Sequence, residues 1–132
     1  IQQATLVRAM VRDLDMPVEI VVAPTVREAD GLAMSSRNSY LDAPARERAL
    51  ALSGALRAVQ RAHAGGERSA ARLEEIARTH LADGGISEVD YVAVAHPDTL
   101  EPHVQADAGS IVALAARVGR TRLIDNVILG RA

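Results

Sequence analysis

Residues 17–41, PVEIVVAPTVREADGLAMSSRNSYL, divide the chain into two parts of different character. The apolar, β-branched run VEIVVA at 18–23 lies between two prolines and predicts a short buried strand of a parallel sheet. Residues 24–41 have neither helical nor strand periodicity and are rich in Gly, Ser, Asn, Asp and Arg, so they predict a long loop. We therefore expect one structural unit to end near residue 24 and a second to begin near residue 42.

A helix is predicted before this strand, over residues 2–14. Apolar side chains recur there at helical spacing, at Val7, Met10, Val11 and Leu14. A helix followed by a buried strand is half of an α/β unit, and a parallel strand requires neighbours that the preceding residues do not supply. We therefore expect residues 1–24 to be the end of a larger α/β domain, and Ile1 in place of Met agrees with a processed chain or a fragment.

The residues after the loop predict a small α+β lobe. A helix is expected over 43–64, with Asp42 as its N-cap and two glycines at its end, and a second helix begins after Ser69 and ends near Gly84. These two helices form a predicted helical hairpin. Three apolar runs then predict strands of a mostly antiparallel sheet, at 86–97, 110–118 and 121–129.

The composition excludes several classes of protein. The 132 residues are 48% apolar and 2% aromatic, which suits one domain or a large part of one with an aliphatic core. The absence of Cys excludes disulfides, a thiolate catalyst and a zinc ribbon, and the absence of Lys excludes Schiff-base chemistry. The net charge of −2 lacks the basic excess of a nucleic-acid binder, and no apolar run reaches the roughly 20 residues of a membrane helix. We expect a cytoplasmic location.

The segment DGLAMSSRN, residues 30–38, carries the most distinctive chemistry. Gly31 permits a tight backbone path, Ser35 and Ser36 supply adjacent hydroxyl donors, and Arg37 adds a fixed cation with forked N–H groups. This set of donors suits a phosphate group, as in the triphosphate of a nucleotide. A capped surface turn uses the same residue types, so the residues alone leave both interpretations open.

Three segments together resemble the pantothenate synthetase family. They are QQATLVRAMVRDLDMPVEIVVAP at 2–24, PTVREADGLAMSSRNSYL at 24–41 and RTRLIDNVILG at 120–130. The resemblance implies an α/β fold in which residues 1–24 hold the last helix and strand of a Rossmann-type nucleotidyltransferase domain. Residues 25–41 would then be a hinge with an ATP-binding MSSRN loop, and residues 42–132 a C-terminal α+β lobe.

The resemblance also implies a reaction and a set of binding residues. Members of the family join pantoate to β-alanine through a pantoyl adenylate, consume ATP, and release pyrophosphate and AMP; they are generally homodimers. Mg²⁺ would be carried by the ATP phosphates, with no metal site in the chain. On matching positions Gln3 would bind pantoate, and Val26 would contact adenosine through its backbone. The ATP site would include Met34, Ser35, Ser36 and Arg37, the last three also being the expected catalytic residues.

The chain lacks two parts of the family pattern. No paired-histidine HxGH motif is present, and no Lys-Asp pair precedes Gln2 and Gln3. We therefore expect this chain to be a C-terminal portion that is inactive alone and works with an N-terminal domain. Two alternatives remain: a non-catalytic interaction or dimerisation module derived from the ligase, and a different adenylyl-transferring enzyme on the same scaffold.

The remaining polar residues favour structural roles. His80 lies on an apolar helix stripe and is expected at a core or helix interface, while His96 and His103 are expected in loops. Two acidic pairs are expected to be solvated, namely Asp13 with Asp15 and Glu74 with Glu75. Arg120 and Arg122, close to Asp125 in the sequence, are expected to serve the structure of the lobe.

Overall fold

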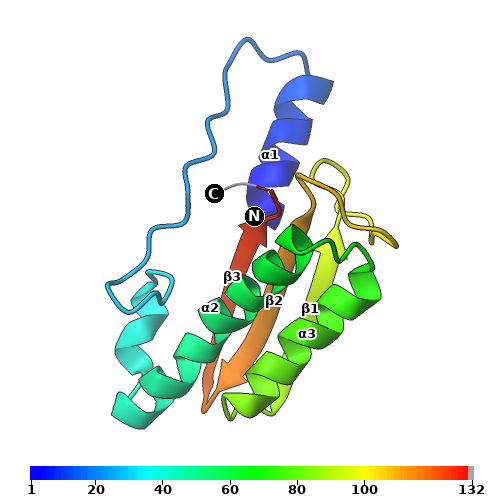
Figure 1. Cartoon of the computed structure of the whole chain (residues 1–132). Coiled ribbons are helices and arrows are strands. Elements are labelled where there is room, and N and C mark those ends of the chain that lie inside the picture. The colour runs from blue at the N-terminus through cyan, green and yellow to red at the C-terminus, as the bar shows by residue number, and fades with distance from the viewer. Residues whose placement is uncertain (131–132) are drawn as a thin grey trace.

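The structure is a computed structural model in which residues 1–130 are described (Figure 1). Its elements follow one another as α1 (Gln2–Asp13), η1 (Ser36–Tyr40), α2 (Ala43–Ala64), α3 (Ala70–Asp83), β1 (Glu88–Ala95), β2 (Ile111–Val118) and β3 (Thr121–Ile128). The predicted helices and the last three predicted strands are all present. The α/β class and the antiparallel sheet of the C-terminal lobe are therefore confirmed, while residues 131–132 of that lobe lie outside the described part.

The sheet has the order β1-β2-β3 with antiparallel neighbours. Val118 pairs with Thr121 across the β2–β3 turn, so Gly119 and Arg120 form a two-residue hairpin loop. Gly119 takes a φ of 61°, which a first loop position in such a hairpin requires and which glycine adopts without steric cost. This turn places the arginine-rich hairpin end beside the start of α2.

Helices α2 and α3 pack together and cover one face of the sheet (Figure 1). Asp42 caps α2 by accepting a hydrogen bond from the Ala45 N–H at 2.8 Å, and Ser69 caps α3 in the same manner at Arg72. The aliphatic core lies between these helices and the sheet. Its fully buried side chains include Leu52, Leu56, Val59, Leu73, Leu81, Val94, Val112 and Leu114.

The predicted strand at 18–23 is absent, which corrects the expectation for this segment. Residues 18–23 run as an extended chain, and Val21 is 80% exposed. A β-branched run becomes a strand only when a neighbouring backbone pairs with it, and no such neighbour lies among residues 1–130. Residues 18–23 therefore have the composition of a strand but no neighbouring strand among residues 1–130 with which to pair.

Helix α1 forms as predicted but is attached to the lobe mainly by polar contacts. Gln2 Nε2 donates to the Tyr91 hydroxyl at 2.9 Å, and Thr5 Oγ1 donates to the Pro97 carbonyl at 3.2 Å. Its predicted apolar stripe is only partly covered: Val7 and Val11 are half-buried, whereas Met10 and Leu14 are exposed. Leu6, outside that stripe, is also exposed, as are Val18 and Val21 beyond the helix. Within residues 1–130, no helix combines the length and the apolarity needed to cross a bilayer.

Candidate functional site

A small hairpin built from residues 26–34 leads into the Ser35–Arg37 segment. The Glu28 N–H donates to the Leu32 carbonyl at 2.8 Å, and the Met34 N–H donates to the Val26 carbonyl at 3.0 Å. Gly31 turns the chain with a φ of 94°, and Leu32 inserts into the core with only 4% exposure. The hairpin thus fixes one end of the predicted ATP loop on the lobe.

Ser35, Ser36 and Arg37 lie together at the start of η1 and are all exposed. Ser35 Oγ caps η1 by accepting a hydrogen bond from the Arg37 N–H at 3.2 Å. This bond uses an oxygen lone pair, so the Ser35 O–H can still donate to an incoming group. The Arg37 guanidinium forms no ion pair with any of residues 1–130. Two hydroxyls and one guanidinium are therefore available side by side.

A cavity of about 260 Å³ adjoins this segment. It lies between the loop and strand β3, and its wall combines the predicted ATP residues Met34, Ser35 and Arg37 with Thr25 and with β3 residues around Asp125 and Asn126. Val26 is exposed beside this wall and is not among its lining residues, and its carbonyl is already used by Met34. Residues from the loop and from the end of the chain thus meet at one concave surface.

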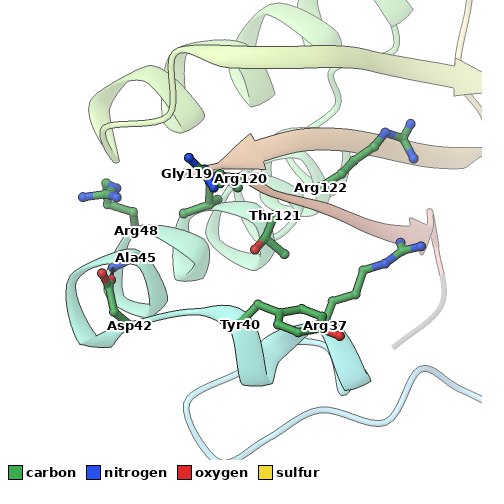
Figure 2. Close-up of a pocket in the computed structure, with 10 residues that line it drawn as sticks. Arg37, Tyr40, Asp42, Ala45, Arg48, Gly119, Arg120, Thr121 and Arg122 are labelled. Atoms are coloured by element: carbon green, nitrogen blue, oxygen red, sulfur yellow. Dashed lines mark hydrogen bonds between the residues drawn. The ribbon is translucent and has the colours of Figure 1, made fainter.

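A second cavity, of about 670 Å³, shares Arg37 and Arg122 with the first. Figure 2 shows Arg37 from η1 and Arg122 from β3 on one side, and Arg48 and Arg120 near the hairpin turn. Arg122 is held by Asp90, with 2.5 Å between Arg122 Nε and Asp90 Oδ2. The carboxylate in this wall, Asp42, caps α2. The positive charge around the cavity favours anions.

Ion pairs with helix α2 hold the 26–34 hairpin, which precedes the Ser35–Arg37 segment. Arg46 from α2 bonds to Glu28 and to Asp30, each at 2.7 Å. The hydrogen bond from Arg46 lowers the pKa of Glu28, and the backbone N–H of Leu32, together with Arg46, lowers the pKa of Asp30. The same two carboxylates raise the pKa of Arg46. These directions all follow from contacts that favour the charged form of each group.

Gln3, the residue expected to bind pantoate, lies on α1 away from the Ser35–Arg37 segment. Its side chain is exposed, and Gln3 lines neither of the two cavities described above, both of which Arg37 lines. The neighbouring Gln2 contacts the lobe through Tyr91 instead. The structure therefore brings Met34, Ser35 and Arg37 to one cavity, while Val26 and the predicted pantoate residue Gln3 do not line it.

Several other expectations can be compared with the contacts. His80 lies at the α2–α3 interface as expected, because a Cβ on Gly54 would fall 2.5 Å from its Nε2. His96 and His103 lie in loops, as expected, with ring centroids 5.4 Å apart. The expectation that Glu74 is solvated was wrong: Glu74 Oε1 accepts the Val94 N–H at 3.0 Å, which satisfies an outer N–H of edge strand β1.

The described residues offer no protein-held metal site. Within residues 1–130, no three His, Asp or Glu side chains come together in a manner that could hold a metal ion. Glu28 and Asp30 in the preceding hairpin are paired with Arg46, and Asp125 in the cavity wall is paired with Arg27. Any divalent cation here would need its oxygen ligands from a substrate and water.

Sequence reasoning missed the residues that hold the loop. Asp125 binds Arg27 rather than Arg120 or Arg122, with 2.7 and 3.0 Å between the paired nitrogen and oxygen atoms. Arg46 and Asn38 also have loop-holding roles that no spacing rule indicated. A usable signal was present for Asp125, because it lies between the apolar residues of a predicted strand, and a carboxylate buried there needs a partner.

The chain is similar to a known family over nearly its whole length. The sequence model of the family described as Pantoate-beta-alanine ligase matches residues 1–128. The chain is 55% identical over 125 residues to the pantothenate synthetase of Anaeromyxobacter dehalogenans, covering 95% of the chain and 43% of that protein. It is 50% identical over 129 residues to the pantothenate synthetase of Herpetosiphon aurantiacus, covering 97% of the chain and 47% of that protein. The chain thus spans less than half the length of these relatives and matches their C-terminal portion.

Solved structures agree with the sequence match. The pantothenate synthetase of Thermus thermophilus superimposes with a TM-score of 0.86 at 44% identity, over 96% of this chain and 46% of that one. The pantoate–β-alanine ligase of Francisella tularensis, solved in a complex with β-γ ATP and β-alanine, gives a TM-score of 0.62 at 25% identity, over 96% of this chain and 40% of that one. Because the family match includes α1, the Ser35–Arg37 segment and β3, the chain belongs to the pantoate–β-alanine ligase family.

Proposed function

We propose that this chain is the C-terminal portion of an ATP-dependent ligase that joins pantoate to β-alanine. The observation that carries the proposal is the exposed group of Ser35, Ser36 and Arg37 beside the 260 Å³ cavity, in a chain of this family. The Francisella tularensis relative was solved with an ATP compound and β-alanine, which supports the same substrate class here. The catalytic activity belongs to the complete enzyme, and the chain alone is expected to be inactive.

The Ser35–Arg37 segment is proposed to bind the ATP phosphates. Ser35 and Ser36 donate hydroxyl hydrogens to phosphate oxygens, and Arg37 donates from its guanidinium. Met34 lines the same cavity and is proposed to pack against the nucleotide, while Val26 is proposed to contact adenosine through its backbone N–H. The Val26 carbonyl already accepts a hydrogen bond from the Met34 N–H. This arrangement uses the free donors of the loop and leaves its internal bonds intact.

The proposed reaction has two balanced steps. A pantoate carboxylate oxygen attacks the α-phosphorus of ATP, the bond to the bridging oxygen breaks, and pyrophosphate leaves. The ammonium group of β-alanine first gives up a proton to water, and the resulting amine attacks the carbonyl carbon of pantoyl adenylate. AMP then leaves with the oxygen of the mixed anhydride, and the nitrogen releases a second proton to water as the amide forms. Arg37 would stabilise the negative charge that develops on the leaving pyrophosphate, which is where a fixed cation accelerates such a step.

The remaining features are proposed from the family resemblance. Gln3 is proposed to bind pantoate through its amide, residues 25–41 to act as a hinge with the ATP loop, and Mg²⁺ to arrive with the ATP phosphates. The complete enzyme is proposed to be a cytoplasmic homodimer. These proposals need the N-terminal portion that the relatives carry, because Gln3 lines neither of the two cavities that Arg37 lines.

The proposal is tested with an assembled enzyme. This chain would be joined to the N-terminal portion of the Anaeromyxobacter dehalogenans enzyme in place of the segment it matches. The assembled protein should release AMP only when pantoate, β-alanine and ATP are all present, and the 132-residue chain alone should release none. A cooperatively folded assembled protein that releases no AMP, while the Anaeromyxobacter dehalogenans enzyme does, would refute the proposed function.

A second candidate function is an interaction module without catalysis. The observation that favours it is the exposed apolar surface of α1 and the following segment, which includes Leu6, Met10, Leu14 and Val21. Sedimentation of the 132-residue chain separates the candidates when combined with the AMP assay. Self-association together with an inactive assembled enzyme would favour the module.

A further inference from the structure

The Ser35–Arg37 segment has few contacts of its own with the lobe. Its three side chains are exposed, and η1 is held locally by the Ser35 cap and by Ser39 Oγ, which donates to the Ser36 carbonyl at 2.8 Å. A phosphate-binding segment binds more tightly when its donors are in place before the ligand arrives, because ordering them during binding costs conformational entropy. Neighbouring residues that fix the position of these donors would therefore strengthen binding.

Arg46 supplies such support from the rigid helix α2. A single nitrogen, Arg46 Nη2, donates to Glu28 Oε2 and to Asp30 Oδ2, both at 2.7 Å. Glu28 lies at the end of the first arm of the 26–34 hairpin, and Asp30 lies within its turn. One side chain therefore fastens both this arm and the turn to the first turns of α2.

Glu28 connects Arg46 to η1 through a hydrogen bond with Asn38. Its second oxygen, Oε1, accepts the Asn38 side-chain N–H at 2.8 Å, and the same Asn38 Nδ2 donates to the Ala33 carbonyl at 3.0 Å. Asn38 follows Arg37 directly and lies within η1. A continuous chain of hydrogen bonds therefore runs from Arg46 through Glu28 to Asn38. Because Asn38 also bonds to the Ala33 carbonyl, these bonds join the two ends of the Ser35–Arg37 segment.

We propose that Arg46 is a positioning residue for the Ser35–Arg37 segment, acting through Glu28 and Asn38, so that the segment is pre-organised for the phosphates of a nucleoside triphosphate. This inference rests on the proposed function for the identity of the ligand. The side chains of Arg46, Glu28 and Asp30 are each about one-third exposed. Ion pairs at such positions contribute little to global stability, so loss of Arg46 should alter the loop and not unfold the lobe.

The test uses Arg46→Ala, which keeps a good helix former on α2 but removes both ion pairs. Its matched control is Arg72→Ala, which removes the exposed Arg72–Glu75 pair from α3. Arg46→Lys is the rescue variant, because one ammonium group has enough N–H donors for both carboxylates. Thermal unfolding verifies that all variants fold.

In the assembled enzyme, Arg46→Ala should raise the KM for ATP by about five- to tenfold, the scale of one weakened charge-assisted contact, with the KM for β-alanine unchanged within about twofold. In the 132-residue chain, amide hydrogen exchange at residues 31–38 should accelerate, while exchange in β2 stays the same. Arg46→Lys should recover most of both effects, and Arg72→Ala should show neither.

Two results would overturn the positioning role. One is unchanged exchange at residues 31–38 in Arg46→Ala, and the other is an equal rise in both KM values with faster exchange throughout the lobe. An inactive assembled enzyme with the natural Arg46 would instead refute the proposed function, and the exchange measurement would then decide on the positioning role by itself.

Discussion

The ion pair between Arg27 and Asp125 gives the sharpest test of how the loop is joined to the lobe. The Asp125 side chain is 3% exposed and accepts two hydrogen bonds from Arg27, at 2.7 and 3.0 Å. Asp125→Asn keeps the shape of the side chain but turns one acceptor into a donor that faces the guanidinium. Breaking a buried pair in this manner costs about 3–5 kcal/mol. We expect about 3 kcal/mol, since the Arg27 side chain is 27% exposed and can recover water.

The loss is measured by urea and thermal unfolding of the 132-residue chain. At about 3–4 °C per kcal/mol for a chain of this size, the melting temperature should fall by about 10 °C. Asp90→Asn is the control, because Asp90 is 31% exposed in its pair with Arg122 and should cost less than about 1 kcal/mol. A double-mutant cycle with Arg27→Met should show strong coupling. Additive effects, or an Asp125→Asn loss no larger than that of Asp90→Asn, would refute the reasoning.

Three further predictions concern packing and pH. Gly84→Ala should destabilise the chain by about 1–3 kcal/mol, because its Cβ would lie 2.4 Å from the Ala51 Cβ. Ala51→Gly should relieve this clash and lower the melting temperature less in the Gly84→Ala background than in the natural chain, since glycine inside α2 itself costs about 1 kcal/mol. An unchanged melting temperature in Gly84→Ala would contradict this packing. Burial, and secondly the charge of Arg68, lowers the pKa of His63. The unfolded chain therefore takes up the proton first, and the free energy of unfolding should fall as the pH falls below about 6.5. His63→Gln should remove this pH dependence, which is measured by unfolding at a series of pH values. The pKa values of Glu28 and Asp30 are lowered, so their contribution to stability is complete above the ordinary carboxyl range and should be lost as the pH falls below about 4. Protection factors at residues 31–38, corrected for the intrinsic pH dependence of exchange, should then fall, and protection factors that stay constant would oppose this.

Local sequence rules predicted the elements of the lobe well. Helical periodicity together with Asp42 and Ser69 as caps gave the bounds of α2 and α3 closely, and Gly119 marked the hairpin between β2 and β3. These features are encoded within a few residues of where they act. The same local reasoning predicted a strand at 18–23, which fails because strand formation depends on a pairing partner that is not local.

The candidate site was predicted only in part for the same physical reason. The donors Ser35, Ser36 and Arg37 are contiguous, so the sequence shows them directly. Asp125 lies 98 residues from Arg27, and with 15 arginines and 17 acidic residues the sequence cannot specify which pairs form. That pairing follows from the packing of the hairpin against β3, a tertiary property.

The central claim is that Arg37 acts on the phosphates of ATP. Its most direct test is pantoate-dependent exchange of labelled pyrophosphate into ATP by the assembled enzyme, which follows adenylate formation without the second step. Arg37→Gln should lower this exchange by at least about a hundredfold, the usual scale for removing one donor from a developing charge, and should leave the melting temperature unchanged. Arg61→Gln, at an exposed position on α2, should retain full exchange. Equal exchange rates for the two variants would contradict the claim.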